Sequence, residues 1–359
     1  MARDVVVLGA TVSGLTSARI LARRGFDVVV LDPNPEGSSA AVGHGVAAVG
    51  HASTVAAMDH AYGPEVVKEH LLRNVAGMAE IREICPSAVE LPLRDRSLPG
   101  GDERETREAV RLFREAGGNA ELLLTPAGAA VSSTALVIDP TSYAAALRAA
   151  AVSAGVQVVH GVTVTHLTRR EGLTRVFFRT NLAWAREPGS LNGHAVVDTL
   201  GVSPWGSAAR IGPEQYVPVV RGRLDVPLHE VSLEATSTAW LVRPIGDGGV
   251  LLLGPKCSFG GIESAAERLQ EWAVTALGAR ELTRSQLTID PSDHGRPVVG
   301  ASAIPGGFYA RGNGRGELMN GTASGHYLAG LIGKRSGAGA ALPPVSQLRA
   351  YGIRRFRPK

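Results

Sequence analysis

Cysteine is scarce in this chain, whose 359 residues include two, Cys85 and Cys257. Two cysteines are too few for a disulfide framework, and these two do not form a CxxC pair of the kind that binds metals. No charged segment followed by an apolar one precedes the first expected strand, so the pattern of a secretory signal is missing as well. We therefore expect a protein of the reducing cytoplasm.

Long apolar runs are also missing, because no stretch reaches the length of about 18 residues that crosses a bilayer. Aromatic residues make up only 5% of the chain, and the 44 glycines and 21 prolines are spread among apolar segments. This distribution excludes a collagen-like repeat and disfavours disorder. A soluble protein with two or three domains is expected from the length.

Charge is nearly balanced, with 37 basic and 33 acidic residues and a net charge of +4. The basic residues are scattered and form no stripe interleaved with aromatics, so neither a nucleic-acid nor a membrane partner is expected. The ten histidines show no metal-ligand spacing such as HExxH. No metal site is predicted.

The opening of the chain carries the strongest signal. Residues 4–8 form a β-branched run typical of a buried parallel strand, and a glycine turn and an apolar helix follow at once. Residues 26–31 form a second strand, with Asp32 at its carboxyl end. Together these segments predict a βαβ unit of about 30 residues.

This unit predicts that a diphosphate binds at the helix N-terminus. Gly9 permits the tight turn, Gly14 lets helix and strand approach, and Asp32 can accept ribose hydroxyls. The middle glycine of GxGxxG is replaced by Thr11, so either the backbone approaches the diphosphate less closely or the threonine hydroxyl adds a hydrogen bond. The residues expected to bind the dinucleotide here are Gly9, Thr11, Val12, Ser13, Gly14, Asp32 and Pro33.

Later segments are read in the same way. Residues 37–47 form a loop of small residues, which permits a bulky planar ligand to approach, and residues 53–60 and 64–82 read as helices. Ile138-Asp-Pro precedes a helix at 144–154 and a strand at 155–160. Further expected elements are a strand at 195–201 that ends in a glycine turn, a strand at 308–310, a glycine loop at 312–316 and a helix at 318–331.

Four of these segments, in this order, resemble the D-amino-acid oxidase-like (DAO) family of FAD-dependent oxidoreductases, of glycine/sarcosine oxidase type. They are the βαβ unit, the Ile138-Asp-Pro segment, the stretch 196–201 with Trp205, and the segment 295–316 with its helix. The resemblance implies FAD as the cofactor. It also implies further FAD-binding residues, namely Ser39, His44, Gly45, Gly201, Trp205, Gly312, Asn313, Gly314, Arg315, Gly316, Glu317 and Leu318.

The implied fold class is α/β, a Rossmann-like FAD-binding domain interleaved with a mainly antiparallel β-sheet substrate domain. We assign residues 1–80, 140–205 and 290–359 to the FAD-binding domain, and residues 81–139 and 206–289 to the substrate domain. The second insertion reads as sheet at 216–226, 239–244 and 250–253, with a hairpin turn at 246–249 and a helix at 263–277. The resemblance implies that this sheet covers the flavin and carries the substrate.

Family members commonly oxidise a C–N bond by hydride transfer to flavin N5, with dioxygen as the second substrate and peroxide as a product. The arginine that often grips the substrate carboxylate in the family is replaced by Ile289, followed by Asp290. The candidates to take over this role are Arg243, Arg296, Arg311 and Arg315. Asp290 facing the substrate would instead favour a cationic amine, for example a specialised metabolite.

The resemblance also implies roles for single residues. His44 lies where some relatives attach FAD covalently, Lys256 is placed to assist oxygen reduction, and Tyr309 and Asn313 are placed to border the ring. The expected catalytic residues are Tyr309, Arg311, Lys256 and Asp290. Two alternatives stay open: another flavin-dependent oxidation, such as C–C desaturation or alcohol oxidation, and a nonredox flavin- or nucleotide-binding protein.

Overall fold

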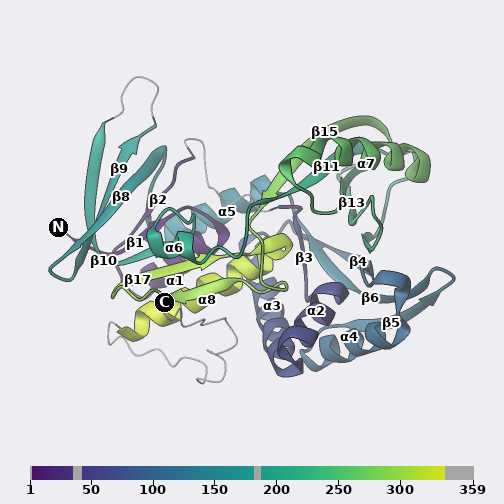
Figure 1. The fold of residues 1–359 in the computed structure, drawn as a ribbon, viewed down its shortest axis with the longest axis horizontal. Coiled ribbons are helices and arrows are strands. Elements are labelled where there is room, and N and C mark those ends of the chain that lie inside the picture. The colour runs from purple at the N-terminus through teal and green to yellow at the C-terminus, as the bar shows by residue number, and fades with distance from the viewer. Residues whose placement is uncertain (1, 35–42, 182–186, 336–359) are drawn as a thin grey trace.

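A computed structural model describes residues 2–34, 43–181 and 187–335 (Figure 1). Two β-sheets lie side by side, and helices pack on both of them. The helices of the described residues are α1 (Val12–Arg23), α2 (Ala52–Tyr62), α3 (Pro64–Ile84), α4 (Glu103–Glu115), α5 (Pro140–Ser153), α6 (Pro204–Ala208), α7 (Ile262–Leu277) and α8 (Glu317–Arg335), with the 3-10 turns η1 (Pro99–Gly101), η2 (Phe259–Gly261) and η3 (Gly314–Gly316).

The first sheet has a parallel centre. Its strands are β1 (Arg3–Leu8), β2 (Val28–Leu31), β7 (Gln157–Val159), β8 (Val162–Arg170), β9 (Leu173–Thr180), β10 (Pro188–Asp198), β16 (Val298–Ala301) and β17 (Gly307–Arg311). β1 pairs in parallel with both β2 and β10, which places Val6 between Val29 and Val196. The run from Val5 to Leu8 is fully buried, as a central strand covered on both faces requires.

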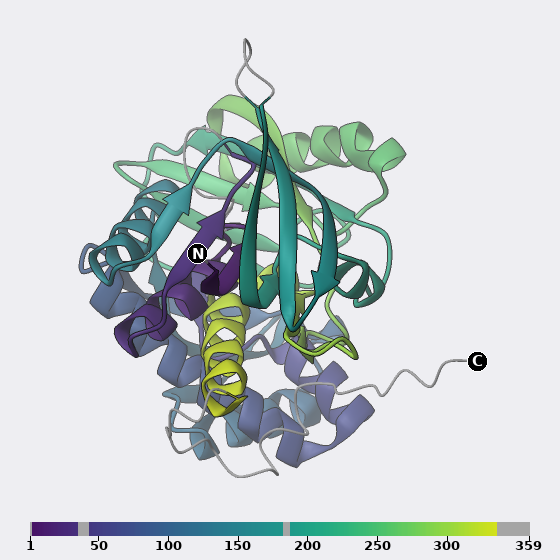
Figure 2. The same cartoon turned by 90° about the vertical axis from the view of Figure 1, so that its left-hand side faces the viewer.

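Helices α1, α5 and α8 cover one face of this sheet, and the hairpin of β8 and β9 covers the other (Figure 2). α8 packs directly on α1 because glycines line its contact side. A Cβ atom added to Gly321 would lie 2.8 Å from Cβ of Val12, and one added to Gly325 would lie 2.6 Å from Cβ of Thr16. The last helix therefore seats on the first through close backbone contact.

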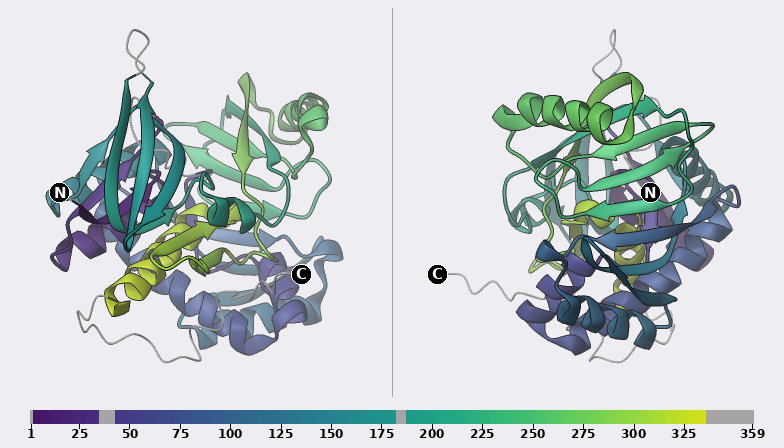
Figure 3. Two further views of the ribbon diagram at one scale, coloured as in Figure 1. Left: turned by 60° about the vertical axis from the view of Figure 1, so that its left-hand side comes forward. Right: turned by 90° about the vertical axis from the view of Figure 1, so that its right-hand side faces the viewer.

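The second sheet is mainly antiparallel. Its strands are β3 (Val46–Ala48), β4 (Val89–Arg96), β5 (Ala120–Thr125), β6 (Gly128–Val137), β11 (Gln215–Arg223), β12 (Val231–Glu234), β13 (Leu241–Ile245), β14 (Gly249–Leu253) and β15 (Arg280–Ile289). The strand order is β15-β11-β14-β13-β12-β4-β6-β3, with β5 paired to β6. Among the described strand pairs of this sheet, only β4 and β12 are parallel. Figure 3 shows α7 across one end of this sheet and the α2–α4 group at the other.

The topology confirms an α/β fold in which a Rossmann-like sheet is interleaved with an antiparallel one. β3 lies in the first range that we assigned to the FAD-binding domain, yet it pairs with β6 of the second sheet. The domain boundaries remain a prediction. The site lies between the two sheets, where loops meet residues of α2, α3 and α8.

Candidate active site

The turn between β1 and α1 is pressed tightly against the helix. Gly9 has a φ of +103°, a backbone conformation that a side chain would strain. A Cβ atom added to Gly14 would lie 2.2 Å from the carbonyl oxygen of Gly9. Both glycines are therefore required by the local geometry, as the sequence pattern predicts.

Thr11 at the middle position of the motif serves the protein itself. Its φ of −73° needs no glycine, and its Oγ1 caps α1 by accepting a hydrogen bond from the backbone N–H of Gly14 at 3.1 Å. The same hydroxyl donates to Oγ1 of Thr199 at 2.8 Å, and Thr199 donates to the carbonyl of Leu8 at 2.9 Å. The hydroxyl is thus bonded inside the protein, and which of the two options for Thr11 holds toward the diphosphate stays a prediction.

This cradle fits a dinucleotide diphosphate. The first turn of the 12-residue helix α1 contains no acidic residue, so its N-terminal N–H groups face no competing negative charge. Asp32 is fully buried at the carboxyl end of β2, where an acid accepts ribose hydroxyls. The glycine turn and the helix N-terminus are placed to bind the diphosphate, and the acid at the end of the next strand is placed to bind the ribose.

A second glycine turn follows β10. The carboxylate of Asp198 accepts hydrogen bonds from the backbone N–H groups of Leu200 (3.0 Å), Gly201 (2.7 Å) and Ser203 (2.6 Å). Gly201 has a φ of +75°, and a Cβ atom there would overlap the guanidinium of Arg311. Glycine at this position therefore leaves room for the Arg311 side chain to pack against the turn.

The buried Arg311 pairs with the partly exposed Asp290 beside this turn. Nε of Arg311 donates to Oδ2 of Asp290 at 2.7 Å, and the backbone N–H of Gly312 donates to the same oxygen at 2.9 Å. The carbonyl of Asp290 accepts from the N–H of Gly314 at 3.1 Å. Asp290 therefore anchors the start of the glycine loop that leads to α8.

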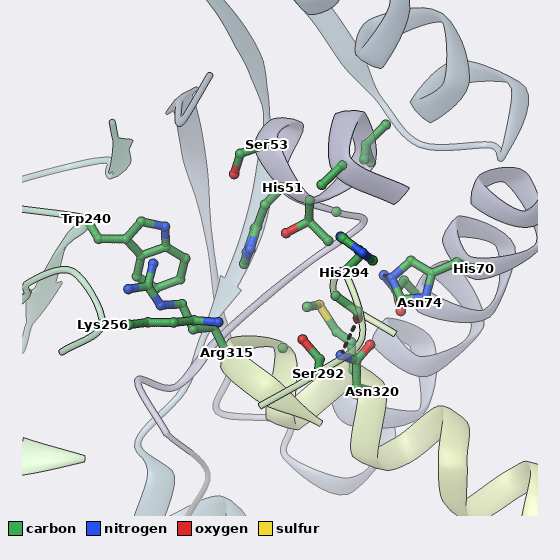
Figure 4. A pocket seen from close by; sticks show the side chains of 17 residues that line it. His51, Ser53, His70, Asn74, Trp240, Lys256, Ser292, His294, Arg315 and Asn320 are labelled. Atoms are coloured by element: carbon green, nitrogen blue, oxygen red, sulfur yellow. Dashed lines mark hydrogen bonds between the residues drawn. The ribbon is translucent and has the colours of Figure 1, made fainter. Parts of the chain in front are cut away.

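A cavity of about 260 Å³ lies between the two sheets. Figure 4 shows two groups of side chains in it, with His51, Trp240, Lys256 and Arg315 on one side and a neutral polar group on the other. The residues that line it are Gly50, His51, Ser53, Thr54, Val55, Ala57, His70, Asn74, Trp240, Lys256, Ser292, His294, Gly295, Arg315, Gly316, Met319 and Asn320.

In the part of the chain that the structure describes, two cations and no carboxylate line this cavity. The guanidinium carbon of Arg315 lies 4.0 Å from the centroid of the Trp240 ring, a cation–π contact. Burial lowers the pKa of Arg315 to about 9. Burial and the neighbouring Arg315 lower the pKa of Lys256 as well. The cavity is therefore electropositive and suits an anionic group.

His44 lies behind this cation pair. Its Nδ1 accepts from the backbone N–H of Val46 at 3.2 Å, so its Nε2 carries the proton and donates to the carbonyl of Arg315 at 2.8 Å. Burial, followed by the nearby His51, lowers the pKa of His44 to about 3, which keeps the ring neutral. The ring also meets Trp240 edge-on, with centroids 5.5 Å apart.

His51 ends the loop that precedes α2 and is 6% exposed. It also meets Trp240 edge-on at 5.5 Å. Burial lowers its pKa, and the nearby Asp95 carboxylate opposes this shift. Nε2 of His51 is buried and has no hydrogen-bond partner within the described residues.

Of the four expected catalytic residues, the structure places Lys256 in the cavity. Tyr309 lies on β17, where its backbone pairs with Asp198 and Gly300, and its half-buried ring is not in the lining. Arg311 and Asp290 are paired with each other outside the lining. The expectation of a substrate-facing Asp290 is therefore not supported by its position.

The expected cofactor residues gather at three places. The residues of the βαβ cradle lie together, Trp205 donates through Nε1 to the carbonyl of Phe308 at 3.1 Å near Gly201, and the loop 312–316 starts α8. Ser39 lies outside the described residues. The contact of the expected cofactor residues with FAD remains a prediction.

The sequence interpretation named Lys256 and Arg315 and missed most of the other polar residues of the cavity. His51, His70, Asn74 and Asn320 come from helices or helix ends, and Trp240 precedes β13. No local pattern marks them, since long-range packing brings them together. Among the described residues no group of three or more His, Cys, Asp or Glu could hold a metal ion, and no helix has the length and hydropathy to span a bilayer.

A dinucleotide cradle joined to a covering sheet with a cationic cavity defines an FAD-dependent oxidoreductase. Residues 4–331 match the family described as FAD dependent oxidoreductase (DAO), and the chain belongs to this family. Its cofactor is FAD, as the sequence resemblance implies. A search of curated protein sequences found no match.

Solved structures share the fold at low sequence identity. Glycine oxidase from Geobacillus kaustophilus is 19% identical, with a TM-score of 0.70 over 99% of this chain and 100% of that one. Iminodiacetate oxidase from Chelativorans sp. BNC1 is 18% identical, with a TM-score of 0.66 over 95% and 97%. L-α-glycerophosphate oxidase from Mycoplasma pneumoniae, solved with FAD bound, is 14% identical, with a TM-score of 0.62 over 92% and 95%.

Proposed function

We propose that this flavoprotein oxidises the C–N bond of a small amino-acid-like amine whose carboxylate binds between Arg315 and Lys256. The observation that carries the proposal is the pair of cations in a cavity whose lining includes no acidic residue. A carboxylate is the small-molecule group that such a pair binds best, and an arginine can bind it through two parallel hydrogen bonds.

The position of Arg315 supports its role as the clamp. Ile289, which stands where the family often has an arginine, is the last residue of β15 and brings no charge. Arg243 lies outside the cavity lining, and Arg311 is paired with Asp290. Among the four arginines considered from the sequence, Arg315 alone lines the cavity.

The chain's residues divide the remaining tasks. Gly9, Gly14 and the N-terminus of α1 would hold the diphosphate of FAD, Asp32 the ribose, and the loop 312–316 the flavin end. When bound, the flavin supplies a hydride acceptor at N5. The side chains of the cavity bind and orient the substrate, and they exclude bulk water from it. Lys256 adds positive charge that would favour reduction of dioxygen as the electron acceptor.

The test is anaerobic bleaching of the flavin by a panel of amines. Glycine, sarcosine and iminodiacetate are compared with methylamine and dimethylamine, which have the C–N bond and no carboxylate. We expect bleaching by at least one carboxylate amine, none by the simple amines, and peroxide when air is admitted. Bleaching by the simple amines alone would contradict the carboxylate site.

Substitution of the two cations locates the site. Arg315→Gln and Lys256→Met are each expected to raise the Kd of the carboxylate amine about 10- to 100-fold, the loss of a charge-assisted hydrogen bond. Lys256→Arg keeps the charge and serves as the matched control. An unchanged Kd in both charge-removing variants would place the carboxylate elsewhere.

Alcohol oxidation is a second candidate, because two cations in a cavity also suit a phosphate. One solved structure with the same fold is named as an oxidase of glycerophosphate, a substrate that carries a phosphate. Bleaching by glycerol 3-phosphate and not by any amine of the panel would favour it. A protein that takes up FAD and is bleached by nothing would favour the nonredox alternative.

A further inference from the structure

Four histidines surround or line the cavity, and the surroundings of His51 differ from those of the other three. Both ring nitrogens of His44 are occupied by backbone groups. Nε2 of His70 lies 3.2 Å from Nδ2 of Asn74, which donates to it. His294 is exposed to solvent. His51 is the remaining histidine, buried and with Nε2 lacking a hydrogen-bond partner in the described part of the chain.

His51 is held as a neutral ring with a negative charge close by. The charged and titratable groups around it are Asp95 on β4, Arg315 before α8, Lys256 after β14, His44 before β3, His70 on α3 and the exposed His294. Burial and the positive charge of Arg315 lower the pKa of His51, whereas Asp95 raises it. Asp95 is fixed in place, since its Oδ2 accepts from the N–H of Ala52 at 2.6 Å and its Oδ1 from the N–H of Ser97 at 2.8 Å.

A substrate amine bound in this cavity needs a base that removes its proton. Amines enter as ammonium ions at neutral pH, and nitrogen must regain its lone pair before the C–N bond can be oxidised. No carboxylate of the described residues lines the cavity to hold an ammonium ion, and both cations there repel one. Figure 4 shows the ring of His51 and the end of Lys256 pointing into the same space.

Resting on the proposed function, we infer that His51 is the base that takes the proton from the bound substrate ammonium. The N–H bond of the ammonium breaks, its electron pair stays on the substrate nitrogen, and the proton bonds to Nε2 of His51. The positive charge moves from the substrate to the imidazolium, where Asp95 lies beside it. The negative charge of the substrate carboxylate, bound at Arg315, also stabilises the imidazolium.

The first experiment counts protons without turnover. The flavin of the holoenzyme is reduced by light, so that sarcosine binds and cannot react, and calorimetry in two buffers of different ionisation enthalpy gives the protons released at pH 7.5. The wild type is expected to release close to none, because His51 keeps the proton. His51→Asn is expected to release about one per bound sarcosine, since only the free amine then binds.

The two ideas fail in different ways in this experiment. Equal proton release by the wild type and His51→Asn overturns the role of His51 and leaves the carboxylate site intact. Absence of sarcosine and glycine binding in the wild type overturns the carboxylate site, and the inference about His51 falls with it. Flavin content and thermal unfolding of the variant report whether it has folded.

The second experiment follows the rate constant of anaerobic flavin reduction by sarcosine, divided by its Kd, across pH 6 to 10. The wild type is expected to be nearly flat above pH 7. His51→Asn is expected to be about 1,000-fold slower at pH 7 and to rise tenfold per pH unit as free amine accumulates, approaching the wild type at pH 10. His294→Asn, the exposed cavity histidine, should keep the wild-type profile shape. A loss in His51→Asn that is equal at every pH overturns the inference.

Discussion

Nε of Arg311 and the backbone N–H of Gly312 donate to one oxygen, Oδ2 of Asp290, at 2.7 and 2.9 Å. The arginine is 8% exposed, so this contact compensates a buried charge at the entrance to the loop that precedes α8. The pair holds the last residue of β17 against the segment that follows β15. Two segments 21 residues apart in the sequence are joined there.

We predict that Asp290→Asn destabilises the protein by about 2–3 kcal/mol, because a neutral amide leaves the buried Arg311 poorly compensated. Urea unfolding measures this value, and flavin content should fall with it because the loop at Gly312 loses its anchor. Asp225→Asn removes a matched Asp–Arg pair at the surface, with 2.7 Å between Asp225 and Arg280 and both side chains about 70% exposed. It should cost about 0.5 kcal/mol, and equal costs for the two variants would refute the buried role of Asp290.

Gly14→Ala should abolish FAD binding. The added methyl group would lie 2.2 Å from the carbonyl oxygen of Gly9, so the turn and α1 must separate and the diphosphate cradle opens. The ratio of flavin to protein absorbance after purification with added FAD is the measurement. Gly260→Ala is the control, because a Cβ atom there meets no atom within 4 Å. A yellow Gly14→Ala protein would show that the cradle tolerates the opening.

FAD is predicted to be bound noncovalently. Both ring nitrogens of His44 are engaged with the backbone, at 3.2 Å to Val46 and 2.8 Å to Arg315, so neither is available for a bond to a flavin. After acid precipitation, the bands of oxidised flavin should pass into the supernatant. Flavin that stays with the pellet in the wild type and leaves it in His44→Asn would overturn this reading.

Glu317 makes the stability of the FAD-free protein depend on pH. Burial and the nearby Asp290 raise its pKa from 4.5 to about 7, against the hydrogen bond from Asn313 that opposes the shift. The folded state therefore binds more protons than the unfolded state between these two values, so this residue's contribution to stability falls as pH rises from 4.5 to 7. Above pH 7 the loss from this residue should amount to about 3 kcal/mol.

Glu317→Gln is expected to match the wild type at pH 5 and to be more stable at pH 8, as measured by urea unfolding of the apoprotein. Glu65 also lies in the first turn of a helix, α3, and is exposed. Glu65→Gln should show no such divergence. Parallel pH curves for wild type and Glu317→Gln would contradict the buried carboxyl.

The sequence predicted the elements whose signals are local. The βαβ unit, the helices near 53–82, 144–154, 263–277 and 318–331, and the strands near 216–253 are all present, because apolar periodicity and glycine turns mark them. The β8–β9 hairpin, β4 to β6 and α4 received no assignment. Their strands alternate apolar and polar residues over exposed faces, which gives a weak pattern.

The site was predicted less well than the fold. Tyr309 and Arg311 were chosen because β17 ends near the glycine loop, but the sequence does not tell which face of a strand meets a ligand. Arg315 was expected near the flavin, and its neighbour in the cavity, Trp240, comes from the other sheet. Contacts between the two sheets depend on packing across about 75 residues of sequence, and no local pattern encodes them.

The seat of α8 on α1 sets an order of events during synthesis. The ribosome releases the diphosphate turn first, whereas the helix that packs on it through Gly321 and Gly325 emerges some 300 residues later. At about 5–20 residues per second, the N-terminal unit waits on the order of 15 to 60 seconds for its partner. Strand β17 and the loop that carries Arg315 arrive in the same late segment. The nascent chain thus passes most of its synthesis with an unfinished nucleotide site, and the cofactor can be captured only near release.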